Sequence, residues 1–263
     1  MENKYTLATL QKGINVLNLF KTDAKLSFSD IQHRLKYNKS TLFRILYTLE
    51  QNHYLLRDVH GSYELGLEVY ILGNQLSKVG RLEKFASVAL QQLAEETGLT
   101  VHLGILDGLE VVIIGKYHPP SSALSMFSRI GSAVPAHCTG QGKVLLAYSP
   151  REKVERIINT QGLRRYTPTT LTTPRELFSE LEIIRSQGYA VDRAEHEQHI
   201  YCVAMPLLDE MGQVEAAVSM TGLMMYFEDS TLIADKVKTL SRTINQIRRK
   251  MHFEQKQKGT HHV

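Results

Sequence analysis

The 263-residue sequence has only two cysteines, Cys138 and Cys202. Two thiols in a chain of this length do not form a disulfide framework, which favours a reducing compartment. The sequence has no apolar run of the roughly 18 residues that a membrane-spanning helix needs. The N-terminus also lacks the basic segment and long apolar run of a secretory signal. These absences predict a cytoplasmic protein with no membrane partner.

The charge is spread unevenly along the chain, although the net value is only +4. Residues 1–60 hold nine Lys/Arg and five Asp/Glu, and residues 236–263 hold eight basic residues and one acidic residue, so the middle carries a net −7. A basic N-terminal segment suits a polyanionic partner. An excess of this size also arises by chance, so charge alone does not identify the partner. The length favours two domains.

Three segments near the N-terminus predict three helices. The first has an apolar stripe at helical spacing, formed by Leu7, Leu10, Ile14 and Leu17. Ser27 and Asp30 form the S-x-x-D pattern of a capping box, which predicts a second helix from about Phe28. We expect Asn38, in the link that follows, to take a left-handed turn conformation. A third helix then runs from about Ser40 to Asn52, with Leu42, Ile45, Leu46 and Leu49 facing inward.

The outward face of the third predicted helix suits a nucleic acid. Ser40 and Thr41 lie at its N-terminus, where free backbone amides and the helix dipole favour a phosphate. Arg44, one turn further on, could donate two hydrogen bonds from its guanidinium to the acceptor edge of a guanine in the major groove. Phe43 and Tyr47 could pack on sugars or thymine methyl groups. An ordinary solvated helix face is an equally weighted alternative on this pattern alone.

A hairpin after the third helix favours the first of these interpretations. YLLRDVHGSYELG predicts a strand, a tight turn at His60-Gly61 and a second strand. Three helices followed by such a wing form a winged helix-turn-helix, which places its third helix in the major groove of DNA. The predicted DNA-contacting residues are Lys39, Ser40, Thr41, Phe43, Arg44, Tyr47 and Arg57.

The rest of the chain predicts a larger α+β domain with an antiparallel sheet. A linker helix with Gly73 inside it is predicted to join the two domains, and later segments predict a helix ending at Gly98, a hairpin turning at Asp107-Gly108 and a strand over 124–131. A helix from about Lys143, a helix ending at Gly188, a hairpin over 201–222 and a last helix after Asp229 follow. The predicted division is 1–65 for the winged helix-turn-helix, 66–80 for the linker helix, 81–253 for the second domain and 254–263 for a disordered tail.

No motif in the second domain predicts an enzyme, a metal site or a cofactor. TGQGK lacks the spacing of a phosphate-binding loop, and there is no G-x-S-x-G elbow and no H-E-x-x-H. His196 and His199 in EHEQH are better explained as part of a polar loop. Asp192, Cys202 and Ser219 could surround a small-molecule pocket. The residues alone slightly favour a buried core thiol at Cys202 and a loop cap at Asp192.

Several motifs resemble those of the IclR family of bacterial transcription regulators. KSTLFRILYTLEQNHYL is similar to the family's recognition helix and the strand after it, and YELGLEVYILG to its wing end and linker helix. TVHLGILDGLEVVIIGK, PAHCTGQGKVLLA and GYAVDRAEHEQHIYCVAMPLLDEMGQVEAAVSMTG resemble its effector domain in order and spacing. The resemblance covers about residues 6–250. It implies a GAF-like effector-binding domain that takes small carboxylates such as keto or sugar acids, and a homodimer or dimer of dimers joined partly through the DNA-binding domains.

The resemblance also implies a set of effector-binding positions. They fall on Met126, Val134, Gly140, Gln141, Asp192, Ile200, Cys202, Ser219 and Thr221. An effector carboxylate would accept hydrogen bonds from backbone amides near Gly140, from Ser219 and from Thr221, and an effector hydroxyl would donate to Asp192. The sequence departs from the family at Tyr37-Asn38, where Gly is usual, at His199, which replaces Gly, and at Gln141, which replaces a small or apolar residue.

These observations predict a metabolite-responsive regulator, more specifically a repressor of a catabolic operon, that binds a palindromic operator in double-stranded DNA. Two alternatives remain open at this point. A cysteine-dependent hydrolase built on the second domain would lose activity on Cys202→Ser. A metabolite-binding module that does not read DNA would be indifferent to Arg44→Ala.

Overall fold

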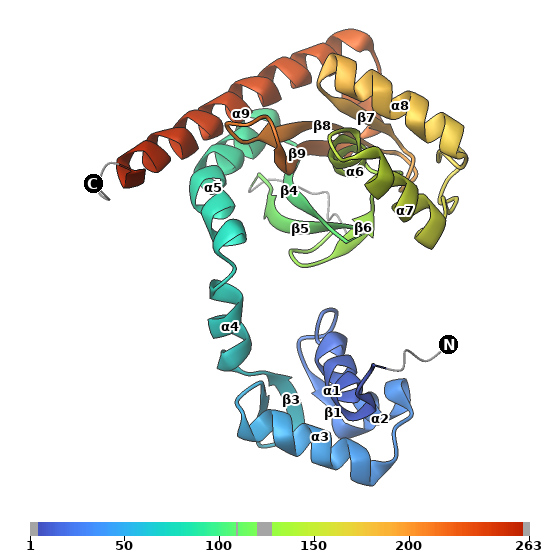
Figure 1. Cartoon of the computed structure of the whole chain (residues 1–263), viewed down its shortest axis with the longest axis vertical. Coiled ribbons are helices and arrows are strands. Elements are labelled where there is room, and N and C mark those ends of the chain that lie inside the picture. Colours follow the sequence, from blue (N-terminus) through green and yellow to red (C-terminus); the bar gives the residue numbers. More distant parts are fainter. Residues whose placement is uncertain (1–4, 109, 120–127, 260–263) are drawn as a thin grey trace. The chain divides into compact units, whose positions relative to one another are not determined.

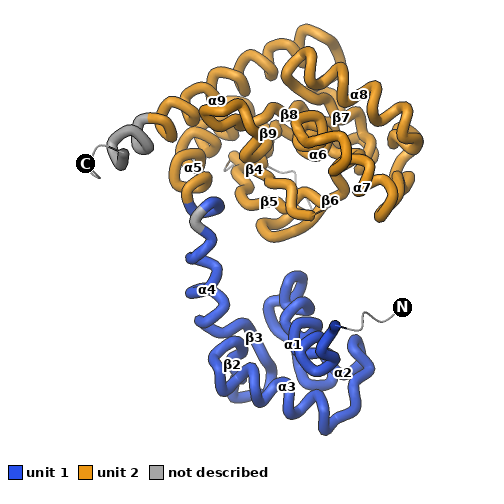
Figure 2. Tube along the Cα trace, in the orientation of Figure 1, with its two compact units in different colours: residues 1–80 blue, residues 81–263 orange. Residues whose placement is uncertain are grey.

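The computed structural model describes residues 5–108, 110–119 and 128–259, with the backbone alone at residue 77 and over 253–259. The chain forms two compact units, residues 1–80 and residues 81–263 (Figure 2). Each unit contains its own cluster of buried apolar side chains. No helix of the described residues is long and apolar enough to cross a membrane.

The first unit is a winged helix-turn-helix, as the sequence predicts. Its elements are α1 (Ala8–Leu19), β1 (Leu26–Ser27), α2 (Phe28–Leu35), α3 (Lys39–Gln51), β2 (Leu55–Arg57) and β3 (Ser62–Leu65) (Figure 1). The three short strands form an antiparallel sheet in the order β1-β3-β2. Ile31 of α2, Leu42 and Leu46 of α3 and Leu55 of β2 are fully buried in the core that joins these elements.

The capping box of α2 is confirmed, but the link to α3 differs from the prediction. Ser27 Oγ accepts a hydrogen bond from the Asp30 amide, and Asp30 Oδ2 accepts one from the Ser27 amide. The left-handed residue is Lys36, with φ of 55°, because the chain turns directly after Leu35. Asn38 is extended and caps α3, since its short side chain accepts a hydrogen bond from the Thr41 amide at 2.8 Å.

The apolar stripe of α1 lies largely outside the core. Leu7, Leu10 and Ile14 are exposed, at 72%, 61% and 43%. Val16 and Phe20, which are one turn apart on another side of the segment, are the residues buried against α2 and α3. The first unit therefore leaves an apolar surface on α1 that its own core does not use.

The predicted linker helix is interrupted. α4 (Leu67–Asn74) and α5 (Ser77–Thr97) are separate helices, and α5 continues into the second unit. α4, all of which is described, has no buried residue. Without packing to support them, the weak helix formers Gly73 and Asn74 do not sustain the helix.

The second unit is built on a six-stranded antiparallel sheet in the described part of the chain, in the order β6-β5-β4-β9-β8-β7. Its strands are β4 (Thr100–Asp107), β5 (Glu110–Tyr117), β6 (Ala133–Pro135), β7 (Ala190–Arg193), β8 (Ile200–Leu208) and β9 (Val214–Leu223). The two predicted hairpins, β4–β5 and β8–β9, are confirmed, and pairing of β4 with β9 joins them into one sheet. The edge strands β6 and β7 were not predicted.

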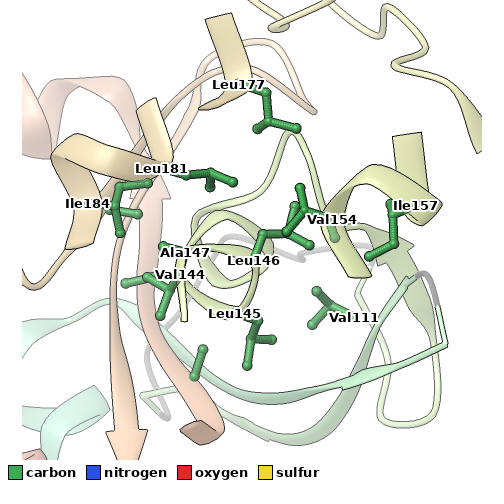
Figure 3. Packing of buried hydrophobic residues seen from close by; sticks show 14 of the residues in the cluster. Val111, Val144, Leu145, Leu146, Ala147, Val154, Ile157, Leu177, Leu181 and Ile184 are labelled. Carbon is green, nitrogen blue, oxygen red and sulfur yellow. The ribbon is translucent and has the colours of Figure 1, made fainter. Parts of the chain in front are cut away.

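Helices cover this sheet (Figure 1). They are α6 (Gly140–Ala147), α7 (Arg151–Gln161), α8 (Pro174–Gln187), the short 3-10 helix η1 (Met224–Phe227) and α9 (Ser230–Gly259). Every residue of α6 is buried, because α6 lies between the sheet and α8. Val144 and Leu146 of α6 pack with Leu181 and Ile184 of α8 and Val154 of α7 in one apolar cluster (Figure 3).

Three expectations for this unit need correction or fall outside the structure. α6 begins at Gly140, before the predicted start near Lys143, because Thr139 caps it by accepting from the Gly142 amide. α9 continues to Gly259, six residues into the predicted disordered tail, since Glu, Gln and Lys are good helix formers. The predicted strand over 124–131 lies half outside the described residues, and residues 128–131 are not in a strand.

Candidate functional site

The outward face of α3 is open to solvent. Lys39, Ser40, Phe43, Arg44 and Tyr47 are exposed and Thr41 is half-buried. The rings of Phe43 and Tyr47, one turn apart, stack with centroids 6.3 Å apart. The Ser40 hydroxyl donates to Asn38 Oδ1 at 3.1 Å, so in this conformation its proton is not directed at a phosphate oxygen. The face thus presents an aromatic pair beside a guanidinium, without a carboxylate between residues 39 and 49.

The wing is organised by one aspartate. Asp58 Oδ1 accepts hydrogen bonds from the His60 amide at 2.9 Å and the Ser62 amide at 2.8 Å, and its other oxygen pairs with Lys25. The hydrogen bond with Lys25 and those from the backbone lower the pKa of Asp58 to about 2. Arg57, at the end of β2, is exposed and turns back toward the Tyr63 ring, 5.7 Å from its centroid. Val59, next to the tip, is 95% exposed.

The second unit contains a cavity of about 80 Å³ where the N-terminus of α6 meets strands of the sheet. The described residues that sequence reasoning assigned to a pocket all line it: Val134, Gly140, Gln141, Asp192, Ile200, Cys202, Ser219 and Thr221. Met126, the ninth, lies outside the described residues. The cavity therefore brings together residues from α6, β6, β7, β8 and β9 that are far apart in the sequence.

Two glycines let α6 approach the sheet closely. A Cβ at Gly140 would overlap Cys202 Sγ on β8, and a Cβ at Gly142 would overlap the Ala136 backbone. The glycines of TGQGK are therefore explained by packing. This close approach puts the N-terminus of α6 at the cavity wall.

One wall of the cavity carries neutral hydrogen-bonding groups. His102 Nε2 lies 2.8 Å from Ser128 Oγ, and His102 Nδ1 lies 3.4 Å from Thr221 Oγ1. Burial, with a smaller contribution from Lys116, lowers the pKa of His102 to about 4. The imidazole is therefore neutral near pH 7 and offers one donor and one acceptor.

Gln141 serves mainly to hold α6 in place. Its Nε2 donates to the His102 carbonyl at 3.0 Å and to the Ala217 carbonyl at 2.9 Å, which ties α6 to β4 and β9. Both donor hydrogens of the amide are used in these bonds. Only Gln141 Oε1, an acceptor, remains for a molecule in the cavity.

A buried charge cluster lies next to the opposite wall. Lys143 of α6 is fully buried, and its ammonium donates to Glu180 Oε1 at 2.9 Å, the Val191 carbonyl at 2.9 Å and Glu195 Oε1 at 2.5 Å. Burial disfavours the charged ammonium, but Glu195 and Glu180 outweigh it and raise the pKa of Lys143. Through these hydrogen bonds, Lys143 of α6 links the segment after β7 to α8.

Asp192 lies between this cluster and the cavity. It is 7% exposed, and its Oδ1 accepts a hydrogen bond from the Glu195 amide at 2.8 Å. Burial and the neighbouring Glu195 raise the pKa of Asp192 to about 7, with Lys143 opposing them. Its carboxyl is therefore the acid of the cavity wall that changes charge near neutral pH.

The two cysteines are free and buried. Burial and the charge of Asp192 both raise the pKa of Cys202 and of Cys138 well above the usual range. A nucleophilic cysteine needs a lowered pKa, so the environment of Cys202 opposes the hydrolase alternative. Among the described residues, no group of three or more His, Cys, Asp and Glu side chains is arranged to hold a metal ion.

Sequence reasoning missed several residues that line the cavity: His102, Ile113, Ser128, Thr139, His196 and Glu197. His102 could have been recognised from the sequence, because it is a polar residue between Val101 and Leu103 in an otherwise apolar predicted strand. His196 and Glu197 belong to EHEQH, which the sequence indicated to be a polar loop. His199 of that motif is exposed and takes a left-handed conformation, with φ of 65°.

Comparison with known proteins accounts for both units. Residues 75–249 match the family model of the bacterial transcriptional regulator IclR C-terminal domain, and residues 9–59 match that of the IclR helix-turn-helix domain. The chain belongs to the IclR family. It is accordingly a DNA-binding transcriptional regulator with an effector-binding C-terminal domain, and the family resemblance inferred from its motifs is confirmed.

Curated relatives and solved structures agree with this assignment. The regulator XynR of Escherichia coli K12 is 34% identical over 228 residues, which are 86% of this chain and 90% of XynR. The repressor AllR of Salmonella typhi is 35% identical over 215 residues, 81% of this chain and 79% of AllR. An IclR homologue from Microbacterium hydrocarbonoxydans, crystallised with 4-hydroxybenzoate, shares the fold with a TM-score of 0.83 at 24% identity, covering 93% of this chain and 99% of that one.

Proposed function

We propose that this IclR-family member is a repressor that binds a palindromic operator as a homodimer and senses a small carboxylate. The observation that carries the proposal is the presence, in one chain, of an exposed α3 face and a cavity with several hydrogen-bonding side chains in its wall. AllR, one of its relatives, is a repressor. A ligand that binds one state of the regulator more tightly than the other shifts operator occupancy by that difference in affinity.

The DNA-contacting residues proposed are those of α3 and the wing named above. Arg44 is the proposed base-reading residue, because its exposed guanidinium lies one turn after the helix N-terminus. Thr41 and Lys39 are proposed phosphate contacts. Phe43 and Tyr47 supply a stacked apolar surface of the kind that packs on sugars and thymine methyl groups.

Exposed apolar residues of the first unit support the homodimer. α1 exposes Leu7, Leu10 and Ile14, and the segment from α4 to α5 exposes Leu67, Tyr70, Ile71, Leu72 and Leu76. Exposed apolar surface of this extent is typical of an interface. A second copy, related by a two-fold axis, would cover it and present two α3 helices to a palindrome.

The proposed effector site is the cavity of the second unit. Ser219, Thr221 and the N-terminus of α6 supply hydrogen-bond donors for a carboxylate, and 4-hydroxybenzoate, the ligand of the Microbacterium homologue, is a small carboxylate. No catalytic role is proposed for the chain. The buried Cys202 thiol with its raised pKa supports a binding role for that residue over a nucleophilic one.

The test of the DNA-binding part is operator affinity. Binding of the full chain to its own upstream DNA, at two salt concentrations, is compared for wild type and Arg44→Ala. We expect tight, salt-sensitive binding that Arg44→Ala weakens by about 1–3 kcal/mol. Arg156→Ala, which removes one exposed positive charge from α7, is the matched control and should bind as the wild type does.

Equal binding by wild type and Arg44→Ala would favour the alternative of a metabolite-binding module that does not read DNA through α3. If the wild type does not bind its own upstream DNA, a genome-wide binding selection shows whether the operator lies elsewhere. Failure to select any sequence would contradict the proposed operator.

The test of the homodimer is molar mass in solution. We expect Leu10→Glu and Tyr70→Glu to shift the chain toward monomer in sedimentation, because each places a charge in the proposed interface. Met211→Glu places the same charge at another exposed apolar position, in the β8–β9 turn, and is the control. A mass that none of these variants changes would contradict the proposed surface.

A further inference from the structure

We propose that Asp192 acts in the cavity as a neutral carboxylic acid and donates a hydrogen bond to an acceptor oxygen of the effector. The inference rests on the proposed function in one respect, since it takes this cavity to be the effector site. It reverses the role expected from the sequence, in which Asp192 accepts a hydrogen bond from an effector hydroxyl. It also adds a pH dependence to effector recognition.

The position of Asp192 isolates its carboxyl from water. The residue lies on β7, paired with Cys202 of β8, and its Cβ lies within van der Waals distance, 3.7 Å, of where a Cβ at Gly140 would stand. It is 7% exposed and lines the cavity. A buried carboxylate in such a place needs a cation or several hydrogen bonds to remain ionised.

The cation beside Asp192 is already paired with two other carboxylates. The three hydrogens of the Lys143 ammonium are directed to Glu180, the Val191 carbonyl and Glu195, so one positive charge already serves two carboxylates. An ionised Asp192 would be a third carboxylate beside it. No lysine or arginine is among the described residues that line the cavity.

The other groups around Asp192 do not supply the missing charge. Glu195 and Glu197, in the segment after β7, both raise its pKa. The thiols of Cys202 on β8 and Cys138 before α6 are neutral, because their pKa values are raised. Burial lowers the pKa of the cavity imidazoles of His102 and His196, so neither carries a positive charge at neutral pH. Among the described residues, the hydrogen bond from the Glu195 amide and the charge of the already paired Lys143 are the contributions that favour the ionised form.

A protonated Asp192 changes which ligand fits. Its oxygen that faces away from the Glu195 amide can carry the proton and donate it, so the partner atom must be an acceptor such as a carboxylate or keto oxygen. The pKa of Asp192 is about 7 in the unliganded chain, and a bound anion raises it further. Binding above that pH therefore takes up a proton, and the affinity should fall by up to about tenfold per pH unit.

The protonation state is tested without a ligand. Carboxyl ¹³C resonances of aspartate-labelled full-length chain are followed by NMR from acidic to alkaline pH. We expect one carboxyl to titrate near neutrality and to be absent from the Asp192→Asn variant. Titration of every aspartate carboxyl below about pH 5, near the ordinary range, would overturn the inference.

Glu197→Gln is the matched variant for this titration. It removes a neighbouring carboxylate but keeps Asp192, so the midpoint should fall without disappearing. Circular dichroism shows whether Asp192→Asn folds. If it does not, comparison of the wild type with Glu197→Gln still assigns the titration, because only an aspartate carboxyl next to Glu197 should change its midpoint. A near-neutral midpoint that Glu197→Gln leaves unmoved would contradict its assignment to Asp192.

The donor role is tested with two carboxylate probes, pyruvate and 4-hydroxybenzoate, by calorimetry at about pH 6 and about pH 8. For a probe that binds, we expect the wild type to lose about tenfold or more in affinity at the higher pH. Asp192→Asn keeps a hydrogen-bond donor that cannot ionise, so its affinity should vary much less. Asp192→Leu should bind weakly at both values. Equal wild-type affinity at the two pH values would overturn the donor role.

The two assays separate failure of this inference from failure of the proposed function. Ionisation of Asp192 at acidic pH, with probe binding that does not depend on pH, would overturn the inference and leave a carboxylate effector in place. A near-neutral titration without binding of either probe would contradict the carboxylate effector. It would leave the neutral state of Asp192 established.

Discussion

The two units of this regulator place their polar residues in opposite ways. In the first unit, the residues proposed to meet DNA stand on the outside of α3, where Arg44 and Tyr47 are exposed. In the second unit, polar residues at the cavity and next to it are buried, and His102, Lys143 and Asp192 are each less than 10% exposed. Most of the first surface lies on one helix. The second depends on strands and helices that meet only when the chain has folded.

This difference sets how each unit should respond to substitution. An exposed side chain exchanges protein contacts for water at little cost, so its removal changes binding more than stability. A buried charge depends on its partners, and removing one partner leaves the other uncompensated in a poorly solvated place. Substitutions on the proposed DNA-binding face should therefore change the free energy of unfolding very little. Substitutions of buried charges in the second unit should lower it clearly.

The largest effect is expected at the buried cation. Lys143→Met removes the ammonium that pairs with Glu180 and Glu195, and should lower the free energy of unfolding by about 3–5 kcal/mol. Chemical denaturation of the purified chain measures this. Lys238→Met, on the exposed side of α9, should change it by less than about 0.5 kcal/mol. Equal effects at the two lysines would remove the contrast between buried and exposed charge.

Two glycines offer the next largest contrast. Gly140→Ala places a methyl group against Cys202 Sγ and should cost about 1–3 kcal/mol, because the close approach of α6 to β8 leaves no space for it. Cys202→Ala in the same chain should recover part of this loss. At Gly73, in exposed α4, no atom lies within 4 Å of the new Cβ, so Gly73→Ala should stabilise by up to about 1 kcal/mol. Thermal unfolding measures the stability of the three variants. A stability change of the same sign for Gly140→Ala and Gly73→Ala would contradict this packing.

A local effect within the first unit should be smaller. Ser27→Ala removes the acceptor that caps the Asp30 amide at the start of α2, and should cost about 1 kcal/mol. Ser27→Asn, which keeps a capping oxygen, should recover most of the loss in the same denaturation experiment. Equal loss in both variants would show that the cap contributes little to the stability of this unit.

The smallest change in stability is expected at the proposed DNA-reading residue. Arg44→Ala should alter the free energy of unfolding by less than about 0.5 kcal/mol, because the guanidinium is exposed on α3. The same variant should lose operator affinity. A destabilisation comparable to that of Ser27→Ala would mean that Arg44 supports the fold, and its loss of DNA binding could then not be assigned to a direct contact.

Much of the fold was predictable because it follows from short-range patterns. The capping box at Ser27, the wing turn at Gly61 and the tight turns of the two central hairpins each depend on residues close together in the sequence. Family resemblance then supplied cavity positions that local patterns did not single out, such as Ile200 and Thr221. The left-handed residue at Lys36 was misplaced to Asn38, because helix capping and turn formation favour the same residue type.

The sequence by itself determined the helix-turn-helix with its wing, the outward face of α3 and the two central hairpins, because periodicity, capping and tight turns act along short stretches of chain. Only the tertiary structure decided which apolar stripe is buried, since Leu10 and Ile14 have the spacing of a core face but lie outside it. It also decided the electrostatics of the cavity. Lys143, Glu180, Asp192 and Glu195 come from α6, α8 and the segment around β7, and their charges interact strongly because folding brings them together away from water.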